Sequence, residues 1–250
     1  MVRTAFGASC AALTLLLLAG CGSSAAGGDA AGAYIAAADA LSAKLAAAGS
    51  GGQVPGPSDP AVTAFEAESQ KALGALGTPA LPVTGFDSYE QICGRAAKVV
   101  GAYINFGVDR AAPDAKAALM NSNANQYMNQ MFTPLLFSAH CSAAHMPFIE
   151  KSTTAEDFKT KAAALQQIRG GAYAQASGLL EMASSKDLDP ARRSKIVGIL
   201  AADSRNFAIP LSAVQRQSLA AGADALPADA NNQAIKAGFS LAPCGPLCAM

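Results

Sequence analysis

Residues 86–104, FDSYEQICGRAAKVVGAYI, carry a clear helical pattern. Asp87 and Glu90 have the spacing of a capping box, in which each side chain satisfies a free backbone N–H at the start of a helix. Apolar residues then recur at intervals of three and four, which places them on one side of that helix. They are Phe86, Tyr89, Cys93, Ala97, Val100 and Ile104. The segment therefore predicts a helix whose buried face includes Cys93.

Similar patterns extend in both directions, and no stretch shows the alternation expected of a strand. Alanine is abundant and tryptophan is absent from the 250 residues, which favours helices that approach one another closely. Upstream helices are expected over 33–48 and 60–76, separated by a Pro/Gly linker at 49–60. We expect an all-α fold, an irregular multi-helix bundle of about seven to nine helices stapled by disulfides.

Prolines and capping residues predict the downstream helix boundaries. Pro113 suits the first turn of a helix, Pro134 should kink or divide that helix, and Pro147 should end its second stretch. Thr153 and Glu156 have the spacing of another capping box. The next helix should weaken at Gly170-Gly171, and further starts are expected at Asp189-Pro190, Pro210 and Pro227.

The first twenty residues have the layout of a secretory signal peptide. Arg3 is followed by an apolar run from Ala11 to Leu18 and then by small residues. The run is shorter than the about 20 residues that a transmembrane helix needs. At its end, Leu18-Ala19-Gly20-Cys21 resembles the lipobox of bacterial lipoprotein precursors.

This resemblance implies that residues 1–20 are removed and that Cys21 receives a diacylglyceryl group, usually with a further acyl chain such as palmitate on the new amino group. Two or more acyl chains anchor a protein stably to a membrane without spanning it. Gly22, in place of Asp, resembles Gram-negative sorting signals for the outer membrane, facing the periplasm. An alanine-rich chain also suits a Gram-positive source, so the sequence does not decide which membrane carries the anchor.

The mature chain divides into three expected parts. Residues 21–32 form a flexible tether of small residues, residues 33–238 form the helical domain, and residues 239–250 form a tail with two cysteines. Removal of Arg3 with the leader leaves 17 basic and 18 acidic side chains, which are dispersed along the sequence. Nucleic acid is therefore not expected as a partner, because phosphate binding needs a basic patch.

Four cysteines remain once Cys10 leaves with the leader and Cys21 is acylated. In an oxidising compartment, four cysteines suggest two disulfides, and three connectivities are possible. We favour the pairs Cys93 with Cys141 and Cys244 with Cys248. The tail sequence CGPLC has one residue too many for a C-x-x-C redox motif, so a structural clip is favoured over a redox role.

A metal site is a weaker hypothesis for the segment around Cys141. The two histidines of the chain, His140 and His145, flank this cysteine, and Met146 follows them. Imidazole, thiolate and thioether together would suit Cu(I). A spacing of five, however, turns the histidines away from a shared helix face, and methionines at helical spacing usually fill a core.

No sequence pattern names a reaction, so no catalytic residue and no cofactor are predicted. Ser138 lies two residues before His140, but neighbours in sequence do not form a catalytic triad. The segment Asn121 to Gln130 is rich in amides, which could form a hydrogen-bonding face or an exposed helix surface. We favour the exposed surface, since surface amides need no special cause.

We therefore expect a lipid-anchored envelope protein whose helical domain is a non-enzymatic interaction module for another envelope component. An alternative is a periplasmic carrier of a small ligand or a copper-like metal, with its pocket between helices near Tyr127 to Met146, where Pro134 should interrupt packing. An enzyme of unknown class is the third possibility.

Overall fold

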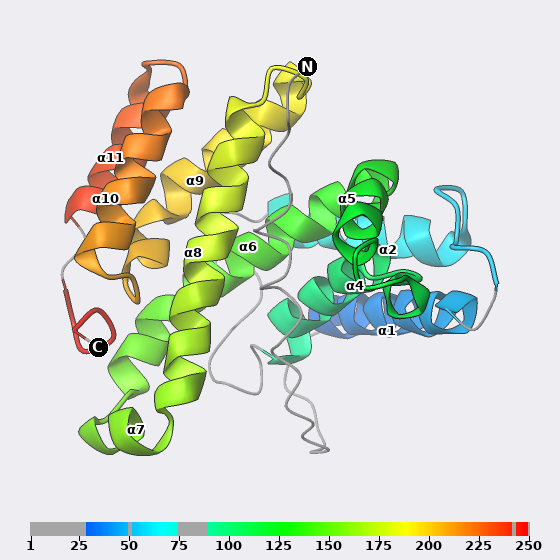
Figure 1. Cartoon of the computed structure of the whole chain (residues 1–250), viewed down its shortest axis with the longest axis horizontal. Helices are drawn as coiled ribbons and strands as arrows, with labels where there is room; N and C mark the ends of the chain where they lie inside the picture. The colour runs from blue at the N-terminus through cyan, green and yellow to red at the C-terminus, as the bar shows by residue number, and fades with distance from the viewer. Residues whose placement is uncertain (1–28, 50–51, 75–89, 242–243, 250) are drawn as a thin grey trace. The chain divides into compact units, whose positions relative to one another are not determined.

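The computed structural model describes residues 29–49, 52–74, 90–241 and 244–249. Within these ranges the chain forms ten α-helices, with short 3₁₀ and π segments and no β-strand (Figure 1). The predicted all-α fold class is confirmed. Among the helices in these ranges, none combines the length and apolarity that crossing a bilayer requires.

The predicted disulfides are also present. One joins Cys244 to Cys248, and Cys93 and Cys141 are disulfide-bonded as well. Cys21, the expected lipidation site, lies outside the described residues. So do Phe86, Asp87 and Tyr89 at the start of the segment that predicts the fold.

The chain divides into two compact units, residues 1–138 and 139–250, and the division falls within helix α6. In the first unit, α1 packs against both α2 and α4, and α5 packs against α4. The elements are α1 (Asp29–Gly49), α2 (Pro60–Gly74), η2 (Glu90–Gly94), α4 (Arg95–Ile104), η3 (Val108–Arg110), α5 (Lys116–Gln126) and the first part of α6 (Met128–Ser152).

Helix α4 confirms the predicted buried face. Val100 and Ile104 are buried, and Cys93 is buried in the π segment that precedes the helix. Ala97 of the predicted face is only half-buried. At the centre of this unit the ring of Tyr34 lies 5.7 Å from Phe65 and 5.0 Å from Phe137, measured between ring centroids. An aromatic cluster from α1, α2 and α6 therefore forms the middle of the first core.

Helix α6 corrects two predictions that were made from prolines. It runs without interruption through Pro134 and Pro147 to Ser152, whereas the break between helices lies at Tyr127. Each proline removes only one backbone hydrogen bond from a 25-residue helix. Thr133 and Leu136 around Pro134 are buried, as are Met146 and Ile149 around Pro147, so packing of the helix outweighs the loss of those two bonds.

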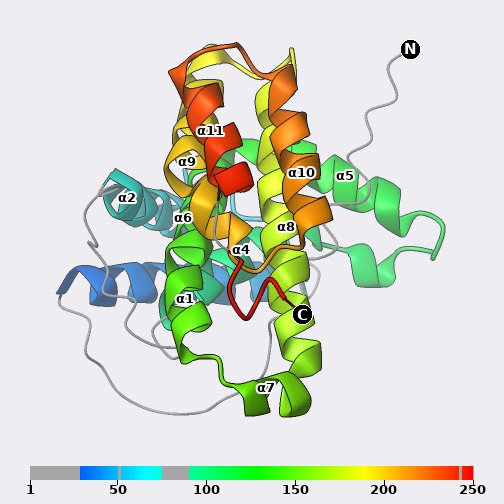
Figure 2. The same cartoon turned by 90° about the vertical axis from the view of Figure 1, so that its left-hand side faces the viewer.

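The second unit contains a ring of four packed helices. Helix α8 contacts α9 and α10, and α11 contacts the same two helices, so each helix has two neighbours in the ring (Figures 1 and 2). The elements are the end of α6, α7 (Ala155–Thr160), α8 (Ala162–Ser184), α9 (Pro190–Ala208), α10 (Ala213–Gly222), η4 (Ala223–Ala225) and α11 (Ala230–Leu241).

Side-chain caps set the starts of several of these helices. Asp189 accepts a hydrogen bond from the backbone N–H of Arg192, as the Asp189-Pro190 pair predicts. The predicted capping box at Thr153 is wrong by one residue, because Thr154 and Asp157 form it instead. Thr153 already donates its hydroxyl to the carbonyl of Ile149 in the last turn of α6.

One other predicted boundary is displaced, and one predicted weak point does not interrupt its helix. Helix α10 begins after Ser212, which forms a capping box with Gln215, rather than at Pro210. Helix α8 continues through Gly170-Gly171, so the glycines cause no break there. In both places the hydrogen bonds and burial of neighbouring residues decide the boundary more strongly than glycine or proline alone.

Candidate functional site

The C-terminal tail is fixed to the second unit by a buried leucine. Leu247 has no exposed surface, and it packs in a cluster formed by α6, α8 and the tail. The buried members of the cluster are Met146, Ile149, Leu165 and Leu247, with Phe158, Ile168 and Ile209 packed against them. The tail is therefore part of this core and does not hang free from it.

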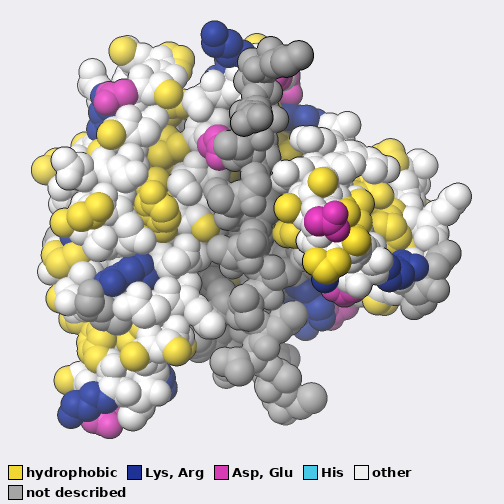
Figure 3. Space-filling model, viewed as in Figure 1, with side chains coloured by type: hydrophobic (Ala, Val, Ile, Leu, Met, Phe, Trp, Pro, Cys, Tyr) yellow, Lys and Arg dark blue, Asp and Glu magenta, His cyan; other side chains and the backbone are white. Residues whose placement is uncertain are grey.

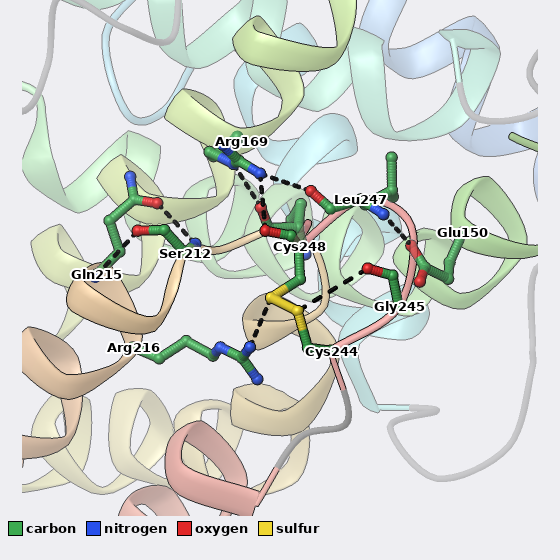
Figure 4. Close-up of a disulfide and its surroundings, with 10 residues drawn as sticks. Glu150, Arg169, Ser212, Gln215, Arg216, Cys244, Gly245, Leu247 and Cys248 are labelled. Atoms are coloured by element: carbon green, nitrogen blue, oxygen red, sulfur yellow. Dashed lines mark hydrogen bonds between the residues drawn. A yellow bond between two sulfur atoms is a disulfide. The ribbon is translucent and has the colours of Figure 1, made fainter. Parts of the chain in front are cut away.

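Arg169 on α8 holds the backbone of the tail. Its guanidinium is buried and donates to the carbonyl oxygens of Pro210 at 2.7 Å, Leu247 at 2.6 Å and Cys248 at 3.3 Å (Figure 4). Hydrogen bonds from a charged donor are stronger than those between neutral groups. One side chain thus joins α8, the segment before α10 and the tail.

Glu150 on α6 lies against the tail from another direction. Its Oε2 accepts a hydrogen bond from the backbone N–H of Leu247 at 3.1 Å. Burial raises the pKa of the Glu150 carboxyl group, and the bond from Leu247 opposes that rise. A Cβ atom on Gly245 would overlap the carboxylate of Glu150, so a larger residue at this position of the tail would displace that carboxylate.

The disulfide itself lies beside a second arginine. Arg216 on α10 is buried, and its Nη2 lies 2.6 Å from the Sγ of Cys248 (Figure 4). The Ser212–Gln215 capping box fixes the helix turn that carries this arginine. Cys248 is buried whereas Cys244 is exposed, so the two sulfurs of one bond have different surroundings.

The two histidines of the metal hypothesis have different environments. The Nδ1 of His140 lies 2.6 Å from the Oδ2 of Asp203, a buried carboxylate on α9. His145 has no exposed surface, and its ring stacks on Phe148 with 5.3 Å between ring centroids. Burial lowers the pKa of His145 to about 4, so this ring is neutral at neutral pH.

The other proposed metal ligands also have structural positions. Met146 lies in the cluster around Leu247, and Cys141 is disulfide-bonded, so it offers no thiolate in this state. In the described part of the chain, no group of three or more His, Cys, Asp or Glu side chains could hold a metal ion. The copper-like site stays a prediction without a set of converging ligands.

The amide-rich segment combines two roles. Asn123 is buried and donates its side-chain N–H groups to the carbonyls of Ile104 and Phe106, and Gln130 donates to the carbonyl of Pro55 at 2.8 Å. Asn125 and Gln126 are exposed, as predicted for a helix surface. Two of the amides therefore fix backbone segments of the first unit.

Four buried hydroxyl groups of the first unit have no hydrogen-bond partner among the residues that the structure describes. They belong to Tyr34, Ser69, Tyr103 and Ser138. Burial raises the pKa of both tyrosine hydroxyls, so they stay protonated. Native proteins leave few buried polar groups unsatisfied, and each costs about 1–3 kcal/mol.

No protein-family model matches the chain, and no curated protein or solved structure is significantly similar to it. Sequence reasoning missed the importance of Glu150, Arg169, Asp203 and Arg216, since each acts on a partner at least 32 residues away along the chain. The one available signal is that a long charged side chain inside an alanine-rich helix needs a partner if that face is buried.

Proposed function

We propose that the protein is a lipid-anchored component of the bacterial cell envelope whose helical part is a non-enzymatic interaction module. The proposal is supported by one combination: a leader that ends at a lipobox cysteine, followed by four cysteines that are all disulfide-bonded. Disulfides persist in oxidising compartments such as the periplasm and the cell surface. The leader and the cysteine chemistry thus indicate the same location.

The side chains that could perform chemistry have structural roles, which supports an interaction module over an enzyme. Arg169 and Glu150 bind backbone groups of the tail, and His145 stacks in a core. On the face of the described residues shown in Figure 3, basic and acidic side chains are scattered and form no patch of one sign. A partner would then be another envelope protein recognised by shape and mixed polar contacts.

Substitution of the lipobox cysteine tests the anchoring part of this proposal. We expect Cys21→Ser to move the protein from the membrane fraction to the soluble fraction, because the acyl chains provide the attachment. Cys10→Ser is the matched control, since Cys10 lies within the leader and should leave the distribution unchanged. Membrane retention of a Cys21→Ser protein from which residues 1–20 have been removed would contradict lipid anchoring.

The interaction part needs a separate measurement on the anchored protein. We expect chemical crosslinking in intact cells, followed by detergent extraction and sedimentation, to show the protein in a complex heavier than one lipidated chain. The Cys21→Ser protein serves as the comparison, because a released chain meets its partner less often. Sedimentation as a single chain after crosslinking would contradict an interaction module.

A second candidate function, a small-ligand carrier, is favoured by the buried hydroxyls of the first unit. A polar ligand that accepts hydrogen bonds from such groups would recover part of their desolvation cost. The test compares Tyr34→Phe with wild type by native mass spectrometry and thermal unfolding. A carrier should lose a co-purifying ligand and its stabilisation in this variant. Without a ligand, removal of an unsatisfied hydroxyl should leave stability equal or higher.

A further inference from the structure

The two cysteines of the Cys244–Cys248 bond have different surroundings, so a thiolate should attack one sulfur in preference to the other. We propose that this disulfide is a site of thiol–disulfide exchange, in which a thiolate substrate attacks the sulfur of Cys244 and the sulfur of Cys248 leaves. This function is independent of lipid anchoring and of the proposed interaction.

Access favours attack at Cys244. Exchange requires that the incoming thiolate reach one sulfur of the bond, and Cys244 is exposed. Cys248 is only 8% exposed, and Arg216 lies against its sulfur. A thiolate therefore reaches the bond from the side of Cys244.

Charge favours departure of Cys248. Arg216 carries a guanidinium cation, and its Nη2 lies 2.6 Å from the Cys248 sulfur. A neighbouring cation stabilises a cysteine thiolate, and a more stable thiolate is a better leaving group. Arg216 would thus stabilise the negative charge that appears on Cys248 as the bond breaks.

The docking of the tail keeps the leaving sulfur in place. Leu247 stays buried, and Arg169 binds the carbonyls of Leu247 and Cys248 independently of the disulfide. Cleavage of the bond therefore leaves Cys248 beside Arg216. The retained thiolate can attack the mixed disulfide at Cys244 and reverse the step, as a resolving cysteine does.

The short loop of this disulfide also favours exchange. Its cysteines are separated by four positions, so the bond removes little chain entropy from the unfolded state. A disulfide that contributes little to folding is less protected from reduction by the folded structure. Cys93 and Cys141 are both buried, which limits the access of a thiolate to their sulfurs.

The reaction balances with a dithiol as reductant. One thiolate forms a bond to the Cys244 sulfur while the S–S bond of the clip breaks, and Cys248 takes the electron pair. The second thiolate of the dithiol then attacks the mixed disulfide at the dithiol's own sulfur, and Cys244 leaves with its electron pair. The dithiol is oxidised by two electrons to a disulfide, and its two protons pass to the two tail cysteines.

The test treats the intact folded protein with reduced glutathione in one arm and, in the other, with a reduced thioredoxin whose resolving cysteine is replaced by serine, so that its mixed disulfide accumulates. Reaction is stopped by alkylation, and peptide mapping locates each mixed disulfide and each free thiol. We expect the mixed disulfide on Cys244, the alkylated thiol on Cys248, and no reaction at Cys93 or Cys141. The faster arm identifies the thiol source as a small molecule or as a protein.

Variants of Arg216 test the role of the charge. Arg216→Gln should slow formation of the mixed disulfide by about three- to tenfold, from the dependence of exchange rates on the leaving thiol. Arg216→Lys should retain most of the rate, and Arg205→Gln, an exposed arginine on α9, is the matched control with an unchanged rate.

Two results would overturn the proposal: attachment mainly at Cys248, or equal rates for Arg216→Gln and Arg205→Gln. Circular dichroism checks that each variant is folded. If Arg216→Gln does not fold, the site of attachment in the unaltered protein still decides the question.

Discussion

Replacement of a glycine by alanine should destabilise the protein at Gly238 in α11 and stabilise it at Gly198 in α9. A Cβ atom built on Gly238 would overlap the Oγ of Ser204 and would lie 2.7 Å from the Cβ of Ser204 and 2.9 Å from the backbone N of Arg205. A Cβ atom on Gly198 would meet nothing within 4 Å. Both glycines lie within helices, so the two substitutions differ in packing alone.

The expected magnitudes follow from two opposing effects. Alanine in place of glycine stabilises a helix by about 0.5–1 kcal/mol, whereas overpacking of a close contact costs about 1–3 kcal/mol. Gly198→Ala should therefore stabilise the protein by about 0.5–1 kcal/mol. Gly238→Ala should destabilise it by roughly 1–2 kcal/mol, because the backbone N of Arg205 cannot rotate away as a side chain can.

Urea unfolding of the two variants and wild type measures both effects. We expect the midpoint to rise for Gly198→Ala and to fall for Gly238→Ala, with an unchanged slope. Ser204→Gly in the Gly238→Ala background should recover part of the loss. A Gly238→Ala protein as stable as the Gly198→Ala protein would refute the close approach of α9 and α11.

Two further predictions concern the second unit. Leu247→Ala should lower the free energy of unfolding by about 2–4 kcal/mol in urea melts, because the side chain is fully buried, whereas Leu241→Ala should have little effect because Leu241 is 76% exposed. Equal effects would contradict docking of the tail. Burial lowers the pKa of His145 to about 4, whereas a histidine in the unfolded chain has a pKa of about 6.5. Between these two pH values the unfolded state binds a proton that the folded state does not, so the free energy of unfolding falls as the pH drops from about 6.5 to about 4. Protonation of His145 should lower the free energy of unfolding by roughly 3 kcal/mol once the pH is below about 4. His145→Phe should remove this part of the pH dependence from the unfolding curves. An unchanged pH profile would contradict a buried neutral ring.

Local signals in the sequence predicted the fold class and several boundaries. The apolar spacing around Val100 is a helical signal that tertiary packing reinforces, and Asp189-Pro190 combines a cap with a residue suited to the first turn. Pro134 and Pro147 misled because a proline has a local cost that a long, well-packed helix can exceed. Thr153 misled because two adjacent threonines both offer a cap, and the end of α6 already uses Thr153.

The candidate site could be predicted only in part. The spacing of Cys244 and Cys248 suggested a disulfide clip, since the two residues are close in sequence. The bonds from Arg169 and Arg216 to the tail depend on how α8, α10 and the tail pack, and no local pattern contains that information. The difference in exposure between Cys244 and Cys248 follows from the same packing.

The most direct test of the central claim is the intact mass of the membrane-extracted mature protein, measured after alkylation with and without reduction. We predict a chain that begins at Cys21, carries lipid mass on that residue, and has no alkylated cysteine before reduction and four after it. A mass without lipid, or free thiols at Cys93 or Cys141 before reduction, would contradict the account of an anchored, disulfide-bonded envelope protein.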